Sequence, residues 1–111
     1  MSYTDKISTV RGELRSIVQA IPEAMQGFGT LSENVEGAGV LDRKQKEMLA
    51  LGMAIVQRCE PCILLHVESF RKAGGTREEL GDILGVAIQM SGGPGVMYSG
   101  HALAAWDEFA K

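Results

Sequence analysis

The sequence predicts an all-α single domain of about six helices, and three observations lead to this fold class. Apolar residues recur at steps of three and four along most of the chain, the spacing that lines one face of a helix. Two segments, Asp42–Gln45 and Thr76–Glu79, have the form of a capping box, which marks a helix start. No segment combines alternating apolar and polar residues with β-branched enrichment, so we expect no strand.

Two helices are expected in the first third of the chain. The first runs from about Asp5 to Ala20 with Thr4 as its N-cap, because apolar residues line one face of this segment. Pro22 ends that pattern and suits the first turn of a second helix. The apolar face of the second helix comprises Met25, Phe28, Leu31 and Val35. The segment from Glu36 to Val40 is expected to be a loop.

The third and fourth helices are expected to form an antiparallel pair. The third runs from Arg43 to about Gln57 and is apolar over much of its circumference, as in a buried central helix. The fourth begins near Cys59, has Pro61 in its first turn, and ends at Ala73 before a Gly-Gly C-cap.

The last two helices follow from the second capping box and from a proline. The fifth helix starts after Thr76, and its Gly81 and Gly85 leave a flat strip that another helix can approach closely. The glycine-rich break that follows ends at Pro94, which suits the start of a sixth helix.

Composition excludes several classes of protein. The 111 residues are 45% hydrophobic and 23% charged, with a net charge of −3, as in a globular domain. The basic residues are scattered, so we expect no nucleic-acid partner. No apolar run approaches the ~20 residues that span a bilayer, and the polar N-terminus has no signal-peptide core. We therefore expect a cytoplasmic protein without a membrane partner.

Four residues with reactive side chains lie within twenty positions. Cys59 and Cys62 are the only cysteines, His66 follows the second by one helical turn, and Glu47 precedes the first by twelve residues. If the chain reverses near Arg58, Glu47 and His66 differ in axial position by only about 4–5 Å, within reach of a glutamate side chain. Cys62 and His66 share a helix face. The start of the fourth helix also favours thiolates at both cysteines.

This arrangement predicts thiol redox chemistry. His66 can accept the proton of Cys62 while Glu47 orients the imidazole. The thiolate can attack a hydroperoxide to give a sulfenic acid, which Cys59 converts to a disulfide with release of water. An external dithiol must then reduce the disulfide, and no cofactor is expected.

The pattern Glu47-x11-Cys59-x2-Cys62-x3-His66 resembles the active-site signature of the alkyl hydroperoxidase D-like proteins of the carboxymuconolactone decarboxylase superfamily. The similarity runs from about residue 41 to 106, which would be the catalytic core of one domain spanning residues 1–111. The resemblance implies a thiol-dependent, peroxiredoxin-type antioxidant enzyme with Cys62 as the peroxide-reacting thiol and Cys59 as the resolving thiol. It also implies a Glu47–His66 proton relay, a thioredoxin- or lipoyl-type reductant, and a homo-oligomer, either a trimer or a hexamer.

The sequence departs from that pattern in two ways. The founding peroxidase has a second histidine just before its second cysteine, where this chain has Pro61. The chain is also shorter, so its first two helices must pack differently. The decarboxylase branch of the superfamily lacks the cysteine pair, which disfavours lactone decarboxylation.

Other interpretations remain open. The cysteines, His66 and Glu47 are chemically suited to zinc, although the usual second ligand pair is missing. The pair also suits a dithiol redox partner or sensor that acts on another protein, or two incidental buried thiols. His101 has no acid in register except distant Glu108 and is interpreted as structural or surface.

Overall fold

The computed structural model describes all 111 residues and confirms the all-α fold with six helices. The helices are α1 (Tyr3–Ala20), α2 (Pro22–Gly37), α3 (Arg43–Val56), α4 (Glu60–Lys72), α5 (Arg77–Ser91) and α6 (Gly93–Phe109). Both predicted capping boxes are present, at Asp42 with Gln45 and at Thr76 with Glu79. These caps explain why α3 and α5 begin where the sequence predicts.

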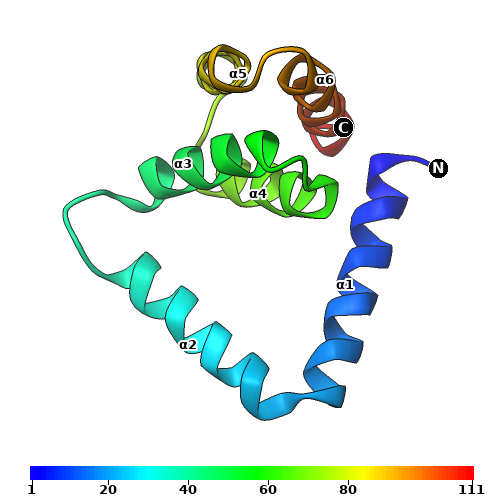
Figure 1. The fold of residues 1–111 in the computed structure, drawn as a ribbon, viewed down its shortest axis with the longest axis vertical. Helices are drawn as coiled ribbons and strands as arrows, with labels where there is room; N and C mark the ends of the chain where they lie inside the picture. The colour runs from blue at the N-terminus through cyan, green and yellow to red at the C-terminus, as the bar shows by residue number, and fades with distance from the viewer.

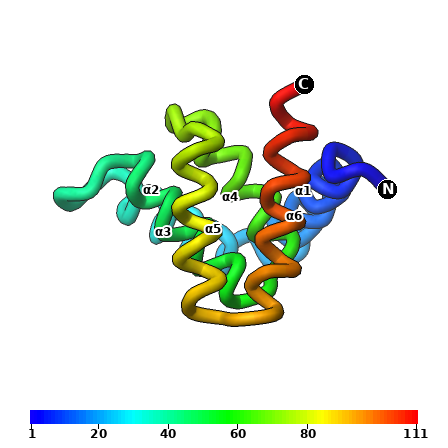
Figure 2. The backbone as a smooth tube through the Cα atoms, turned by 90° about the horizontal axis from the view of Figure 1, so that it is seen from above, coloured from blue at the N-terminus to red at the C-terminus, as the bar shows by residue number.

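The core lies between α3, α4, α5 and α6. Figure 1 shows α3 and α4 side by side, with the α5–α6 pair above them, and Figure 2 shows that α5 and α6 run alongside one another. The largest fully buried side chains come from α3, α4 and α5; they are Phe70, Leu51, Ile55, Ile63, Leu64, Leu80 and Val67. This four-helix layer positions the cysteine-bearing start of α4.

Helix α1 is attached to this layer by its first turns. Its start differs from the prediction: the helix begins at Tyr3 instead of Asp5, and Ser2 is the N-cap instead of Thr4. The carboxylate of Glu108 on α6 accepts hydrogen bonds from the backbone N–H groups of Tyr3 and Thr4, each at 3.1 Å. This carboxylate satisfies amides that the first turn leaves unpaired, so the helix extends further toward the N-terminus than periodicity indicates.

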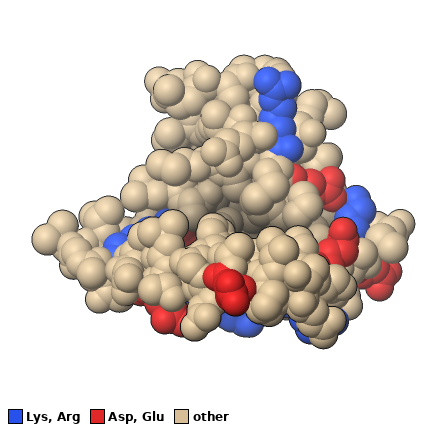
Figure 3. All heavy atoms as spheres, turned by 60° about the horizontal axis from the view of Figure 1, so that its bottom comes forward, with Lys and Arg blue, Asp and Glu red and all other residues tan.

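Helix α2 contributes no buried residue. Its apolar residues Phe28, Leu31 and Val35 are each more than half exposed. Figure 1 shows α1 and α2 as the two arms of a V that reaches away from the core, and Figure 3 shows a broad surface on that side with few, scattered charges. The far end of α2 is held by Lys46, whose ammonium donates to the carbonyls of Val35 and Ala38. An apolar stripe therefore faces away from the chain's own core.

One feature of α3 corrects the sequence interpretation. Helix α3 is not surrounded on all sides: it buries Glu47, Leu51, Ala54 and Ile55, and its other apolar face, with α5, lines an open groove of about 740 Å³. The exposed apolar residues of α3 are Leu49, Met53 and Val56.

The glycine strip of α5 is not used within the chain. Gly81 and Gly85 have nothing within 4 Å of the position that a Cβ atom would take. The close approach between α5 and α6 occurs at Gly95 instead, where a Cβ would lie 3.2 Å from the carbonyl oxygen of Ala87.

Candidate functional site

The turn between α3 and α4 sets the position of the cysteines. Arg58 adopts a left-handed conformation with φ of 58°, its N–H donates to the carbonyl of Ile55, and the N–H of Cys59 donates to the carbonyl of Ala54. These two bonds form a Schellman motif that ends α3. The chain therefore reverses at Arg58, as predicted, and Cys59 becomes at once the N-cap of α4.

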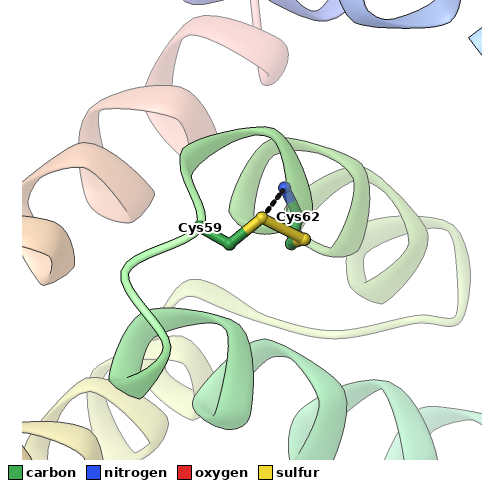
Figure 4. Close-up of a disulfide and its surroundings, with 2 residues drawn as sticks. All are labelled: Cys59 and Cys62. Atoms are coloured by element: carbon green, nitrogen blue, oxygen red, sulfur yellow. Dashed lines mark hydrogen bonds between the residues drawn. A yellow bond between two sulfur atoms is a disulfide. The ribbon is translucent and has the colours of Figure 1, made fainter.

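Cys59 and Cys62 form a disulfide across the first turn of α4, as Figure 4 shows. Their Cα atoms are 5.2 Å apart, and the backbone N–H of Cys62 points at Sγ of Cys59 at 3.3 Å. Both residues are half-buried. An unpaired N–H group at a helix start stabilises a thiolate on the sulfur that it faces. The local geometry thus allows the pair to be either a disulfide or a dithiol with ionised character.

Glu47 and His66 meet across the antiparallel α3–α4 pair. Nδ1 of His66 lies 2.8 Å from Oε2 of Glu47, so the reach predicted from helix geometry is present. Glu47 is only 5% exposed, whereas His66 is half-buried. Because Nδ1 faces the carboxylate, Nε2 is the nitrogen that remains free to exchange a proton. His66 follows Cys62 by one turn of α4, and so the two side chains leave the same face of the helix.

A second group of polar residues beside the cysteines was not found from the sequence. Glu60 follows Cys59, and its Oε1 accepts from Nζ of Lys6 on α1 at 2.9 Å. Its Oε2 lies 3.6 Å from Nδ1 of His101 on α6, a buried nitrogen that has no hydrogen-bond partner. His101 is half-buried, and its Nδ1 faces the acid that follows Cys59 in the sequence. Residues on three separate helices make this contact, and no local spacing predicts it.

Trp106 and Tyr98 pack against other aromatic rings. Trp106 is buried in the core, where its ring lies 5.9 Å from that of Phe70. Tyr98 lies beside His101, with ring centroids 5.2 Å apart.

The open groove between α3 and α5 is not part of this site, since neither cysteine, nor Glu47, nor His66 lines it. No group of three or more His, Cys, Asp and Glu side chains is arranged to hold a metal ion. None of the six helices combines the length and the apolar character that crossing a membrane requires.

The fold and the site together define a class of protein: an all-helical domain in which a Cys-x-x-Cys pair begins one helix and a buried glutamate from the preceding helix contacts a histidine one turn further on. The model of the carboxymuconolactone decarboxylase family matches residues 22–108, and the chain belongs to this family.

Individual relatives support the assignment. The chain is 34% identical over 103 residues to an uncharacterized protein of the cox locus of Paracoccus denitrificans, covering 93% of this chain and 90% of the relative. It is 32% identical over 102 residues to an uncharacterized protein of Cupriavidus necator, covering 92% and 90%.

Two crystal structures have the same fold. One is the apo form of a carboxymuconolactone decarboxylase family protein from Legionella pneumophila, which is 39% identical and has a TM-score of 0.89 over 96% of this chain and 99% of that one. The other is a protein from Thermotoga maritima, which is 27% identical and has a TM-score of 0.82 over 95% and 93%.

Proposed function

We propose that this protein is a thiol-dependent peroxidase that reduces hydroperoxides through a Cys59–Cys62 disulfide cycle. The observation that carries the proposal is the placement of a disulfide-forming pair at a helix start, one turn before a histidine that contacts a buried carboxylate. Each part has a task in peroxide reduction, and membership of a family that includes enzymes is consistent with it.

The proposed reaction has three steps. The Cys62 thiolate, formed by proton transfer to His66, attacks the terminal oxygen of the hydroperoxide. The O–O bond breaks, Cys62 becomes a sulfenic acid, and the leaving alkoxide takes a proton from His66 to depart as an alcohol. The Cys59 thiol then attacks the sulfenic sulfur, which forms the disulfide and releases water. An external dithiol of the thioredoxin or lipoyl type returns two electrons and two protons, and no bound cofactor takes part.

Pro61 places the whole proton transfer on one imidazole. It occupies the position at which the founding peroxidase has its additional histidine, and it lies exposed in the first turn of α4. His66, oriented by Glu47, is therefore the only histidine that the proposal assigns to Cys62.

A dithiol redox partner or sensor is the second candidate function. It is favoured by the half-exposed disulfide, which a partner protein's thiol can approach without entering an enclosed cavity. Lactone decarboxylation is not proposed, because it gives the cysteine pair no task.

The protein is also proposed to act as a homo-oligomer, either a trimer or a hexamer. The supporting observation is the stripe of exposed apolar residues on α2, which comprises Phe28, Leu31 and Val35. These residues are spaced at three and four positions and so share one helix face. An apolar face of this kind on a folded chain is typical of a contact with another protein.

Chemical trapping tests the proposed reaction. One equivalent of hydroperoxide should remove two free thiols from each reduced chain of the native protein. In Cys59→Ser the same treatment should leave a sulfenic acid at Cys62 that a dimedone-type reagent captures. Oxidation by a protein disulfide, together with inertness toward hydroperoxides, would select the redox-partner function instead.

A further inference from the structure

We propose that Lys6 and Glu60 form a positioning pair that sets the reduction equilibrium of the Cys59–Cys62 disulfide. This inference rests on the proposed function, in which Cys59 and Cys62 are reversibly oxidised and reduced. It assigns a role to two residues outside the set of Glu47, Cys59, Cys62 and His66.

Glu60 lies in the first turn of α4, the same turn that carries both cysteines. It lies between the cysteines in sequence, and consecutive Cα atoms are ~3.8 Å apart. It is also the first residue of α4, whose N-terminal amides stabilise thiolates. A carboxylate at this position opposes that stabilisation, because two negative charges repel. Left uncompensated, Glu60 would disfavour the reduced, partly ionised form of the pair.

Lys6 supplies the compensation from a different helix. Its ammonium lies 2.9 Å from Oε1 of Glu60, and this hydrogen bond raises the pKa of Lys6, so the side chain stays charged. On the other side, Nδ1 of His101 faces Oε2 at 3.6 Å. The carboxylate is therefore held between α1 and α6. A shallow depression of about 260 Å³, lined by Lys6, Glu60 and Pro61, keeps the Lys6–Glu60 ion pair in contact with solvent.

The electrostatic role predicts opposite effects for the two partners. A dithiol reagent reduces the Cys59–Cys62 disulfide to two thiols and is itself oxidised to a cyclic disulfide. Ionisation of the protein thiols then shifts the equilibrium toward the reduced protein. Glu60→Gln removes the repulsion and leaves Lys6 in place, so it should favour the reduced form. Lys6→Met leaves Glu60 unopposed and should favour the disulfide. The double variant removes one charge of each sign and should resemble the native protein.

The experiment equilibrates the full chain with dithiothreitol or glutathione redox buffers and measures the fraction of free thiols. At about pH 9, above the ordinary thiol pKa of ~8.5, we expect each single variant to change the reduction equilibrium constant roughly three- to tenfold, in opposite directions. This corresponds to about 14–30 mV for a two-electron couple. The shifts should become smaller as the pH is lowered and the thiolates of the reduced protein are protonated. The other titratable groups near Lys6, Glu60 and the cysteines are unchanged in these variants; they are the α-amino group of Met1 and the side chains of Tyr3, Glu13, Glu47, His66, Tyr98, His101 and Glu108.

A matched control is the Arg77–Asp107 ion pair, which joins α5 to α6 at 2.9 Å without contacting either cysteine. Arg77→Met should leave the equilibrium within about twofold of the native value. Shifts of the same sign in Lys6→Met and Glu60→Gln, or no shift in either, would overturn the proposal. Because no peroxide is used, the outcome is independent of whether the native protein is a peroxidase.

Discussion

Oε2 of Glu47 lies 2.8 Å from Nδ1 of His66, and this contact joins two helices whose connecting turn also positions Cys59. A buried carboxylate needs a partner, and the imidazole is the one that the fold supplies to Glu47. The contact holds the imidazole of His66, which follows Cys62 by one helical turn, and it leaves Nε2 of that ring free. The candidate site is thus a direct product of the antiparallel packing of α3 and α4.

Replacing Glu47 by glutamine should separate the effect of the Glu47 charge from the effect of Glu47 on the orientation of the His66 imidazole. Glu47→Gln keeps the shape of the side chain but removes the charge that stabilises an imidazolium, so we expect peroxide consumption to fall at least about tenfold, since general bases contribute roughly 10²–10⁴. The measurement is the rate of peroxide loss as a function of pH. Glu78→Gln, an exposed acid in the first turn of α5, is the matched control and should retain the native rate. An unchanged rate in Glu47→Gln would remove the relay from the mechanism.

Acid should release α1 before the core unfolds. Hydrogen bonds from the backbone N–H groups of Thr4 and Tyr3 hold the pKa of Glu108 below its usual range. A carboxyl whose pKa is lower in the folded state contributes stability above its unfolded pKa of ~4.3 and loses it as the pH falls through the folded value. The protection of the backbone amides in the first turns of α1 against hydrogen exchange should therefore fall below about pH 4. In Glu108→Gln those amides should exchange quickly already at neutral pH; slow exchange there would contradict the assignment.

Two glycines should respond oppositely to alanine. A Cβ at Gly75 would lie 2.4 Å from the ring of Phe70, which is fully buried and cannot withdraw into solvent. We expect Gly75→Ala to lower the free energy of unfolding by about 1–3 kcal/mol. Gly81 lies inside helix α5, and nothing is within 4 Å of the position that a Cβ would take there. Gly81→Ala should therefore raise the free energy of unfolding by roughly 0.5–1 kcal/mol. Denaturant unfolding measures both, and a destabilised Gly81→Ala would instead indicate that a partner packs on the glycine strip of α5.

The apolar stripe of α2 should control assembly. Sedimentation of the native protein should give a trimer or a hexamer, and Phe28→Glu should dissociate it because a charge would have to be buried in the contact. Gln26→Glu adds the same charge to the same helix away from the stripe and should leave the assembly intact. A monomeric native protein, or equal effects of the two substitutions, would reject α2 as the contact.

Local signals in the sequence predicted the helices and the contact between Glu47 and His66. Capping residues, Pro22, Pro61 and the Gly74–Gly75 pair mark where helices start or stop, and so most boundaries agree with the structure. The contact between Glu47 and His66 was predictable because both flank a single turn at known rise per residue.

The remaining features depend on packing between distant segments. The grouping of Lys6, Glu60 and His101 requires the relative placement of three helices, which periodicity does not encode. The exposed apolar face of α3 was misjudged for a related reason: hydrophobic periodicity reports that a face is apolar, but not whether this chain covers it. The start of α1 was displaced because Glu108, more than a hundred residues away, satisfies its first amides.

The central claim is that Cys62 reacts with peroxide, and peroxide consumption by the native protein and by Cys62→Ser tests it most directly. The assay would offer a hydroperoxide with several dithiol reductants in excess and follow peroxide loss over many turnovers. We expect sustained consumption by the native protein and no consumption above background by Cys62→Ser. Consumption by Cys62→Ser at the native rate would contradict the assignment of Cys62.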